Sequence, residues 1–471
     1  MRFILGLAAA AAVAAPLAAQ GAAPDRLLAR AETAIGPADA RVRAEAFRAR
    51  QSGTGQAAEQ AADPADPVAL VRRSYAWSFD AAAGRMIREA EQVFPGEVRF
   101  LTRAALTPEG GWSVDLLRWR TGTDLAAFGA EDAARSRAQF ERFFPHLLLR
   151  QARAAGRLEP AGPDGFAFTD PAGDRIEVSV DPATGLPLNA RRMVEGRAQT
   201  EIGYDLYARR AGIMLPSRTE IRQAGGGRET VWLGRFDAGA APLEAHAPPP
   251  GYAPPPPPGE PRLAARGDGV HLFENMPAGY RSAAIAHAGG LILVEAPLNP
   301  AYAALQKRLL DAALPGRPVT HVLVTHPHSD HVGGLKAWHD AGATIVAARG
   351  ARVALERQLR AAGAEGELRI EEVADRRSLD GGPVRIDLHA FAGRHSAANL
   401  LVHLPERKIL FQGDLFFVPE RGEVPPQFPI AGELHHEIVT RGLAVEEIVG
   451  IHGRPAGLAD LRLAVERGPA F

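Results

Sequence analysis

The chain reads Thr325-His326-Pro327-His328-Ser329-Asp330-His331-Val332-Gly333-Gly334, with three histidines and one aspartate between positions 326 and 331. An apolar strand is predicted before this segment, at 321–325, and a helix after it, at 334–341. A loop at the end of a strand lets neighbouring side chains converge, because no hydrogen-bond ladder directs them to opposite faces. The chain has only 15 histidines in 471 residues, so this cluster indicates a metal site.

The sequence around this segment alternates between strands and helices. An apolar strand is predicted at 291–294 and a helix at 302–313, ahead of the strand and helix that flank the histidines. Three more strands are predicted at 384–389, 400–404 and 409–412. This alternation predicts an α/β domain in the C-terminal half of the chain.

The spacing His-x-His-x-Asp-His, from His326 to His331, resembles the signature of the metallo-β-lactamase superfamily. The other positions of that signature follow in the family's order. They are His395 in Gly393-Arg-His-Ser-Ala-Ala-Asn399, Asp414 in Gly413-Asp-Leu-Phe416, and His452 in Ile448-Val-Gly-Ile-His-Gly453. The resemblance covers residues 263–471 and implies a four-layer αββα sandwich for this domain.

The resemblance also implies two metal sites that share one ligand. By this carry-over the first metal is bound by His326, His328 and His395, the second by Asp330, His331 and His452, and Asp414 bridges the two. Imidazoles and carboxylates without thiolate suit zinc, so two Zn²⁺ ions are expected. Iron or manganese stays open as an alternative, although relatives that bind iron typically carry a carboxylate where this chain has His328.

Such a ligand set implies hydrolysis. A hydroxide held between two zinc ions exists near neutral pH, because the ions lower the pKa of the water to about 7. It would attack a carbonyl or phosphoryl centre, and Asp330 would act as a catalytic residue that orients it. We therefore expect an enzyme that hydrolyses an ester, a lactone or a phosphoester.

The substrate is not fixed by these residues, because the family supports many hydrolytic reactions on one scaffold. The thiolate β-lactamases have a cysteine at the position of Asp414 and a lysine at that of Phe417. Glu295 and Ile451 replace the aspartate and the glycine that are usual in the family. The apolar residues of one loop, at 415–418 and at Phe428, suggest that part of the substrate is hydrophobic. A β-lactamase, or a non-enzymatic periplasmic carrier with the metal domain as scaffold, remains an alternative.

The other histidines are expected to have different roles. A helix is predicted after the loop 418–432, and it begins with His435 and His436. One of these two histidines could contact the substrate at the metal cleft. Four more are expected to be surface or packing residues without a role in the site; they are His321, His339, His389 and His403.

The first 19 residues predict export. Arg2 provides a positive end, 3–16 is an apolar stretch too short to span a bilayer, and Leu17-Ala-Ala19 is a small-residue cleavage site. We therefore expect a periplasmic or secreted protein. The chain has no cysteine, so neither a lipid anchor at a cysteine nor a disulfide is expected. With 54 basic and 55 acidic residues, charge gives no reason to expect nucleic acid or an anionic membrane as a partner, and the expected partner is a small-molecule substrate.

A proline-rich linker at 247–262 divides the chain. Polyproline segments are extended and semi-rigid, so we expect the linker to hold two semi-independent domains apart. The preceding segment, 24–246, is predicted to be a separate β-rich α+β accessory domain, with a helix at 131–156 and strands at 176–180, 213–223 and 229–236. Its turn Asp181-Pro-Ala-Thr-Gly-Leu-Pro187 and the segments Gly203-Tyr-Asp205 and Gly212-Ile-Met-Leu-Pro216 resemble the half-barrels of periplasmic lipoprotein carriers.

Overall fold

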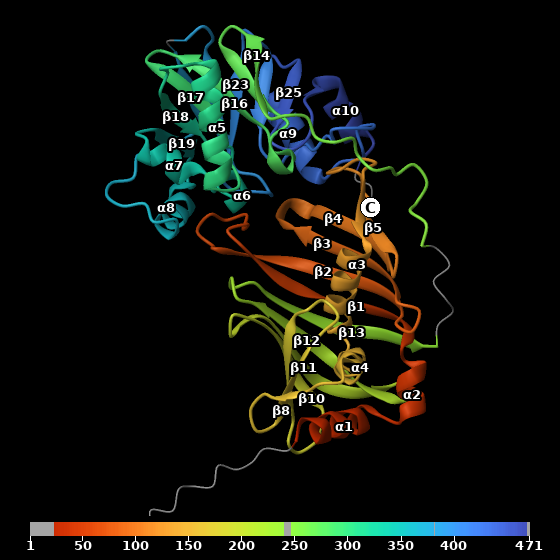
Figure 1. Cartoon of the computed structure of the whole chain (residues 1–471). Coiled ribbons are helices and arrows are strands. Elements are labelled where there is room, and N and C mark those ends of the chain that lie inside the picture. The colour runs from red at the N-terminus through yellow and green to blue at the C-terminus, as the bar shows by residue number, and fades with distance from the viewer. Residues whose placement is uncertain (1–22, 240–245, 381, 469–471) are drawn as a thin grey trace, which may run out of the picture.

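The structure is a computed structural model that describes residues 23–239, 246–380 and 382–468. Figure 1 shows a β-rich part before the linker and an α/β part after it, packed end to end. The predicted signal segment, 1–19, lies outside the described residues. Among the helices that are described, none has the length and apolarity needed to cross a membrane.

The N-terminal part is built on one antiparallel sheet of thirteen strands, which confirms the prediction of a β-rich region. The strand order is β6-β5-β4-β3-β2-β1-β13-β12-β11-β10-β9-β8-β7, so the first and last strands in sequence pair at the middle of the sheet. The strands are β1 (Ala46–Ala58), β2 (Val68–Asp80), β3 (Arg85–Phe94), β4 (Val98–Thr107), β5 (Gly110–Asp115), β6 (Leu125–Gly129), β7 (Glu159–Pro160), β8 (Gly165–Thr169), β9 (Arg175–Val180), β10 (Pro187–Val194), β11 (Arg197–Arg210), β12 (Ile213–Gln223) and β13 (Arg228–Ala238).

Four helices accompany this sheet, namely α1 (Pro24–Ile35), α2 (Ala38–Arg43), α3 (Ala130–Glu141) and α4 (Pro145–Ala155). The segment 131–156, predicted as one helix, is two helices, because Pro145 can begin a helix but cannot continue one. Helices α1 and α4 pack their apolar faces into the same core as the sheet. Phe144 precedes α4 and lies 4.7 Å from the ring of Phe47 on β1. Side chains of helix and sheet therefore fill this core.

The C-terminal part contains two sheets. The first has seven strands: β14 (Arg262–Gly267), β15 (Val270–Glu274), β16 (Ser282–His287), β17 (Gly290–Val294), β18 (Val319–Leu323), β19 (Thr344–Ala348) and β20 (Ile370–Val373). The second has six: β21 (Arg376–Leu379), β22 (Ile386–Phe391), β23 (Asn399–Leu404), β24 (Ile409–Gln412), β25 (Glu447–Gly450) and β26 (Ala456–Gly457). The predicted strand at 384–389 lies two residues further along the chain, as β22.

Apolar residues from both sheets form one core. Ile292 and Val322 of the first sheet and Leu388 and Val402 of the second belong to the same buried cluster. The helices of this part are α5 (Pro300–Ala313), α6 (Ser329–Val332), α7 (Leu335–Asp340), α8 (Arg352–Ala361), α9 (Pro429–Thr440) and α10 (Leu458–Glu466). The strands β18, β24 and β25 are each followed by a loop that carries predicted metal ligands, so the topology delivers those ligands from strand ends.

The expectation that the linker holds the two parts apart is wrong. The start of the linker lies on the N-terminal part, where Ala253 pairs with Asp124 and the Tyr252 hydroxyl donates to the backbone oxygen of Asp115 over 2.8 Å. The two parts also share a hydrophobic core, in which Trp119 packs 4.3 Å from the ring of Phe417. Burial of apolar surface at this contact favours association of the two parts.

Candidate metal centre and its cavity

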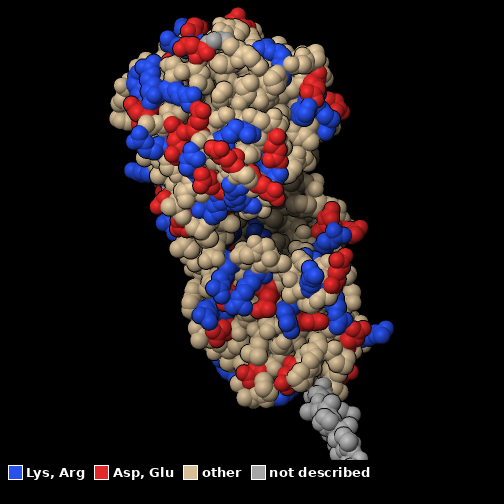
Figure 2. Space-filling view, turned by 90° about the vertical axis from the view of Figure 1, so that its left-hand side faces the viewer, with Lys and Arg blue, Asp and Glu red and all other residues tan. Residues whose placement is uncertain are grey.

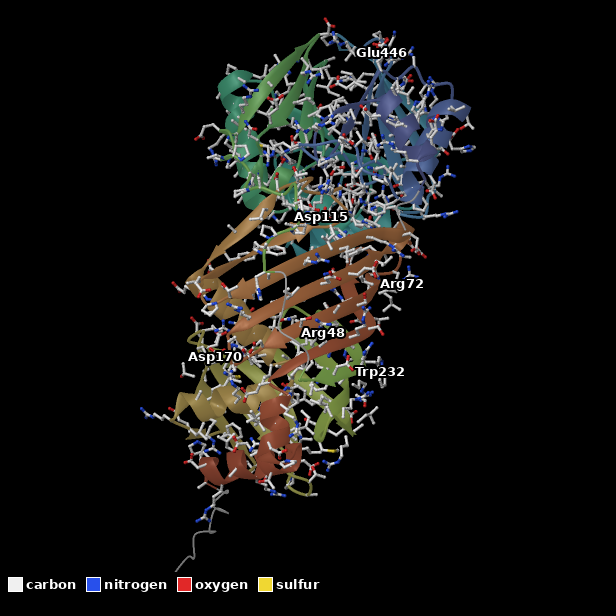
Figure 3. The ribbon with its side chains drawn as sticks, turned by 90° about the vertical axis from the view of Figure 1, so that its right-hand side faces the viewer. Arg48, Arg72, Asp115, Asp170, Trp232 and Glu446 are labelled. Atoms are coloured by element: carbon white, nitrogen blue, oxygen red, sulfur yellow. The ribbon has the colours of Figure 1, made fainter. Side chains whose placement is uncertain are left out.

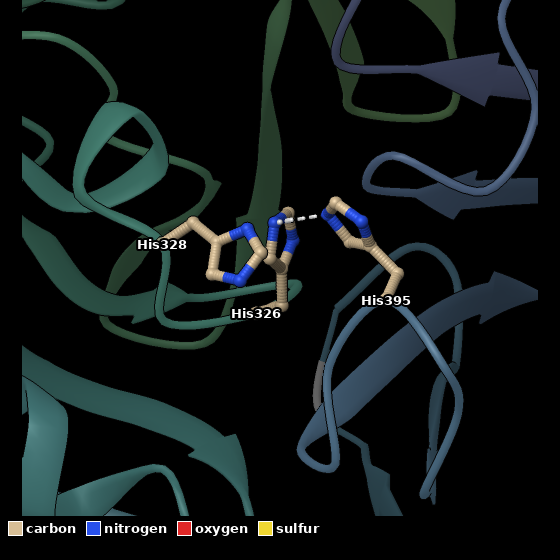
Figure 4. A group of neighbouring side chains, drawn as sticks. All are labelled: His326, His328 and His395. Carbon is tan, nitrogen blue, oxygen red and sulfur yellow. Dashed lines mark hydrogen bonds between the residues drawn. The ribbon is translucent and has the colours of Figure 1, made fainter. Parts of the chain in front are cut away.

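Three of the predicted ligands converge as a histidine cluster. His326 and His328 lie in the loop after β18, and His395 lies in the loop between β22 and β23 (Figure 4). The Nε2 atoms of His326 and His395 are 3.2 Å apart. All three side chains are buried, and one nitrogen from each lies within 4.8 Å of the others. This spacing lets all three imidazoles bind one metal ion.

The remaining predicted ligands form a second cluster beside the first. Asp330 and His331 lie on α6, Asp414 follows β24, and His452 follows β25. One ligand atom from each of the four lies within 4.8 Å of the others. The structure therefore brings all seven sequence-predicted ligands together, in the two groups that the family resemblance implies.

Asp414 lies between the two clusters. Its Oδ1 is 3.1 Å from Nε2 of His331 and 3.2 Å from Nε2 of His452. Its Oδ2 is 3.5 Å from Nε2 of His395 and 4.0 Å from Nε2 of His326. Each oxygen of one carboxylate thus faces a different cluster, which is the arrangement that a bridging ligand requires.

A glycine makes room for this arrangement. A Cβ atom at Gly413, immediately before Asp414, would lie 2.6 Å from Nδ1 of His326 and 2.7 Å from Oγ1 of Thr325. Any side chain at this position would displace the ligand loop. The Gly-Asp pair in the sequence is therefore a packing requirement of the site as well as the source of a ligand.

Buried acceptors hold the ligand loop from behind. Glu295 is fully buried, and its Oε2 lies 3.1 Å from Nδ1 of His331 while its Oε1 accepts from the backbone N–H of Thr325 over 2.7 Å. This contact fixes the proton on Nδ1 of His331 and directs Nε2 toward Asp414. The replacement of the family's usual aspartate by Glu295 thus provides a partner for a ligand.

The N-terminal part supplies further partners through the β1–β2 connection, residues 59–67. Gln60 donates to Oδ1 of Asp330 over 2.7 Å, and the backbone oxygen of Ala61 lies 3.1 Å from Nε2 of His328. The other oxygen of Asp330 accepts from the Tyr280 hydroxyl over 2.8 Å. Two proposed metal ligands, Asp330 and His328, are therefore oriented by a segment of the other domain.

The charges of the site favour a bound cation. Burial, reinforced by neighbouring histidines, holds the pKa of His326 well below its ordinary value, so this imidazole is neutral as a metal ligand must be. Burial also lowers the pKa of His331, but Asp414, Asp330 and Glu295 outweigh it and raise that pKa well above the ordinary value. These carboxylates therefore favour a positive charge at the position that His331 faces, which a metal ion would supply.

The unsatisfied atoms at the site point to the same conclusion. Nδ1 of His328 is buried without a hydrogen-bond partner among the described residues, and Nε2 of His331 and Oδ1 of Asp414, although 3.1 Å apart, do not have the geometry of a hydrogen bond. Leaving such groups unpaired in a folded interior is unfavourable by about 1–3 kcal/mol each. Metal ions bound between the clusters would satisfy all three, so the residues present fit a two-metal centre.

A cavity of about 580 Å³ opens above the metal centre and between the two domains. Figure 2 shows the surface hollowed where the two parts meet. The C-terminal part contributes Tyr280, Phe417 and five of the seven ligands, namely His328, Asp330, His395, Asp414 and His452. The N-terminal part contributes an apolar wall and polar residues beside it, namely Gln60, Phe94, Pro95, Val98, Phe100, Trp119, Arg120, Thr121 and Asp124.

Among the apolar residues expected to meet the substrate, Phe417 lines the cavity, and most of the other apolar lining comes from the N-terminal part. Residues 415–418 are buried in the core between the domains, and of these only Phe417 lines the cavity. His435 and His436 lie within α9 and are not among the described residues that line it. The sequence did not identify Gln60, Glu295 and Tyr280 as hydrogen-bond partners of the ligands Asp330 and His331. A single residue that is distant in sequence from the ligands carries no motif. A buried charge after an apolar strand was the one available signal, at Glu295.

A third group of metal-binding residue types lies on the second sheet. Asp387, His389 and His403 are buried close together, because Asp387 and His403 are cross-strand partners and His389 follows two residues after Asp387. Asp387 pairs with Arg376 and Arg385 at 3.2 and 3.3 Å, so its charge is already balanced. We assign this group no functional role.

Comparison with known proteins finds a family match that includes six of the seven predicted ligands, whereas His452 lies just beyond it. Residues 279–448 match the family described as the metallo-beta-lactamase superfamily, which confirms the resemblance. A metallo-beta-lactamase from Pontibacter korlensis aligns at 17% identity with a TM-score of 0.36, over 44% of this chain and 98% of that one. No curated protein sequence matches this chain.

Two further solved structures align over 44% of this chain. The rubredoxin oxygen:oxidoreductase of Desulfovibrio gigas does so at 16% identity with a TM-score of 0.37, over 60% of its own length. The inverting sec-alkylsulfatase Pisa1 from Pseudomonas sp. does so at 17% identity with a TM-score of 0.34, over 40% of its own length. The N-terminal β-rich part lies outside the family match.

Proposed function

Because residues 279–448 match the metallo-beta-lactamase superfamily, we propose that the protein is a two-metal hydrolase of an ester, a lactone or a phosphoester. One observation carries the proposal. The two oxygens of Asp414 face separate histidine clusters at 3.1–4.0 Å. A shared carboxylate between two imidazole sets suits a pair of metal ions more than one ion or none.

Zinc is the metal that we propose. The donors are imidazoles and carboxylates, thiolate is absent from the whole sequence, and His328 stands where iron-binding relatives typically have a carboxylate. Bound zinc ions supply Lewis acidity and a nucleophile at neutral pH. The seven ligands that we propose are His326, His328, Asp330, His331, His395, Asp414 and His452.

Asp330 is the proposed catalytic residue. Gln60 and Tyr280 each donate to one of its oxygens, so both its charge and its orientation are fixed. Burial opposes ionisation of Asp330, but His331 and the other donors keep its pKa below the ordinary value. A carboxylate held in this way can accept a hydrogen bond from an attacking water molecule and align it with the substrate.

The cavity gives this chemistry a partly dry environment. Phe100 and Trp119 cover the metal centre from the N-terminal side, and Phe417 packs 5.8 Å from the ring of His452 on the other. Apolar cover of this kind excludes bulk water, which strengthens electrostatic interactions with the reacting group. The N-terminal domain is therefore proposed as a part of the active site.

The wider organisation is also proposed. We propose a signal peptide at 1–19, a domain at 24–246, a linker at 247–262 and a catalytic domain at 263–471 with the four-layer αββα arrangement. The signal segment supports a periplasmic or secreted location. The β-lactamase alternative is less favoured, because Phe417 replaces the lysine that holds a lactam carboxylate. The carrier alternative is less favoured, because α1 and α4 fill the core where such a domain would hold an apolar ligand.

Metal analysis joined to a substrate screen tests the proposal. The purified protein should contain close to two zinc ions per chain. It should hydrolyse at least one member of a panel of aryl esters, lactones and phosphodiesters, and a chelator should abolish that activity. A chain that binds no zinc even after zinc is added would disprove the metal centre. A chain with two zinc ions that cleaves only a chromogenic cephalosporin would favour the β-lactamase alternative.

A further inference from the structure

Arg120 is a cationic side chain of the cavity without an acidic partner. It lines the cavity and is exposed, and among the described residues it forms no ion pair within 4.0 Å. The cavity's other charged side chains outside the metal centre are paired, because Asp124 bonds to Arg421 and Glu420 lies 2.7 Å from Arg281. The guanidinium of Arg120 is therefore free to bind an anion.

The loop that carries Arg120 is held in place by hydrogen bonds to buried side chains. The carboxylate of Asp115 is buried and accepts from the backbone N–H groups of Leu117 and Arg120 over 3.0 and 3.1 Å. Trp119 is buried beside it and donates its indole N–H to the backbone oxygen of Arg99. Figure 3 shows Asp115 where the N-terminal sheet meets the upper domain. This bonding fixes the backbone from which Arg120 projects.

An apolar wall lies next to this cation. The rings of Phe94 and Phe100 are 5.3 Å apart, and those of Phe100 and Trp119 are 4.8 Å apart, both in edge-on packing. The guanidinium of Arg120 lies 5.9 Å from the centre of the Phe100 ring. The cation and the wall thus face the same space, directly above the proposed metal centre.

We propose that the substrate is an amphiphile with an apolar body and one anionic oxygen group. The body lies against Phe94, Phe100 and Trp119, and the anion pairs with Arg120. This inference rests on the proposed hydrolytic function, which supplies the reaction. The residues that would select the substrate belong to the N-terminal domain. A guanidinium binds carboxylate and phosphate equally well by charge and hydrogen bonding. The anion can therefore be a separate carboxylate or the phosphodiester that reacts.

Binding of unreactive probes tests the pairing without turnover. The probes are 6-phenylhexanoate and the neutral 6-phenylhexan-1-ol, titrated calorimetrically into the zinc-loaded full chain. We expect Arg120→Gln to weaken the acid about 10-fold, which is the size of one charge-assisted contact, and the alcohol less than 3-fold. Trp119→Phe should weaken both. Arg48→Gln removes an exposed charge of β1 that does not line the cavity, and should change neither.

Turnover of matched esters distinguishes the two sources of the anion. The probes are 4-nitrophenyl hexanoate, the 4-nitrophenyl monoester of adipic acid and bis(4-nitrophenyl) phosphate. We expect Arg120→Gln to lower kcat/KM about 10-fold for the adipate ester if the anion is a separate carboxylate, or for the phosphodiester if it is the reacting group. Arg120→Lys should retain part of the rate. The neutral ester should change less than 3-fold.

Two results would overturn the inference. One is an equal effect of Arg120→Gln on charged and neutral probes, and the other is no effect on either charged binding or charged turnover. A zinc-loaded protein that hydrolyses none of the three esters and no lactone would instead contradict the proposed function. In that case the calorimetric comparison still decides whether Arg120 binds the anion.

Discussion

At the scale of single residues, the two oxygens of Asp414 define the site, because each lies against a different histidine cluster. We predict that Asp414→Ala lowers zinc content from about two ions to one or fewer and lowers turnover more than 100-fold, since both ions lose a ligand. Elemental analysis and circular dichroism should show that metal is lost while the fold is kept.

The matched control for this prediction is Asp340→Ala. Asp340 is a half-exposed aspartate at the end of α7 that pairs with Lys336. Its replacement should leave two zinc ions and full turnover. Full metal content in Asp414→Ala would mean that the two clusters do not share this carboxylate.

Glu295 is the residue behind the second cluster. It accepts from two donors, Nδ1–H of His331 and the backbone N–H of Thr325. A glutamine has one acceptor oxygen and one amide nitrogen, so Glu295→Gln turns an N–H group toward one of these donors. We predict zinc affinity about 10- to 100-fold lower, measured by competition with a chromophoric chelator. Unchanged affinity would show that the ligand loop needs no such support.

At the scale of elements, the β1–β2 connection reaches from one domain to the ligands of the other. Gln60 donates to Asp330, and Glu59 forms a bidentate ion pair with Arg357 at 2.6 Å. We predict that Gln60→Ala lowers kcat about 10-fold with little change in KM, because Asp330 loses a charge-assisted hydrogen bond and with it a fixed orientation. Gln60→Glu should be worse, since two carboxylates would then face each other.

Gln56→Ala is the control, because Gln56 is an exposed residue of β1 that does not line the cavity. Steady-state kinetics of Gln60→Ala, Gln60→Glu and Gln56→Ala would separate an effect on the orientation of Asp330 from a general effect on folding. Equal loss in Gln56→Ala and Gln60→Ala would indicate a general effect on folding rather than on Asp330.

Helix α4 gives the N-terminal domain a dependence on pH. His146 lies in its first turn and is buried, and burial lowers its pKa to about 4 although its Nε2 contacts the backbone oxygen of Ala44 at 2.9 Å. Below the ordinary pKa of 6.5 the unfolded chain takes up a proton that the folded chain excludes, so this residue makes stability fall between about pH 6.5 and pH 4.

Urea unfolding of wild type and His146→Asn at pH 7 and pH 4.5 checks this dependence. We expect the free energy of unfolding of wild type, relative to the variant, to fall by about 2 kcal/mol over this interval. Tryptophan fluorescence can follow the unfolding. A difference between the two proteins that does not change with pH would show that His146 is protonated in the folded state.

The sequence predicted the elements that carry a local pattern. The strand predicted at 213–223 matches β12, and the helix at 302–313 matches α5 within two residues. The strands between Ala46 and Gly129 were missed, because many of their half-exposed positions carry charged or small residues and their alternation is weak. Ligand positions followed from spacing in the family signature. Gln60 and Arg120 could not be predicted in this way, because only tertiary packing brings the β1–β2 connection and the loop after β5 to the metal centre.

At the scale of the whole molecule, the N-terminal domain and the catalytic domain form one structure around the cavity. Trp119 fills a core that also contains Phe417 and Phe428, with ring distances of 4.3 and 5.2 Å. A second contact joins Ala397, next to the His395 loop, to the backbone oxygen of Ala62 over 2.7 Å. Separation of the domains would therefore expose apolar surface and free two ligand loops at the same time.

This arrangement predicts that the catalytic domain does not function alone, contrary to the expectation from the proline-rich linker. A fragment of residues 262–471 should be poorly soluble, because Phe417 and Phe428 lose the cover of Trp119. It should also bind zinc at least about 10-fold more weakly, because His328 and Asp330 lose Ala61 and Gln60 as partners. Adding residues 23–245 as a separate chain should restore solubility, metal content and ester hydrolysis together, since the contacts are noncovalent. Light scattering, elemental analysis and turnover of 4-nitrophenyl hexanoate on the fragment, the mixture and the full chain measure all three. A monomeric fragment that holds two zinc ions and hydrolyses the ester at the full rate would show that the N-terminal domain neither orients the ligands nor covers the site.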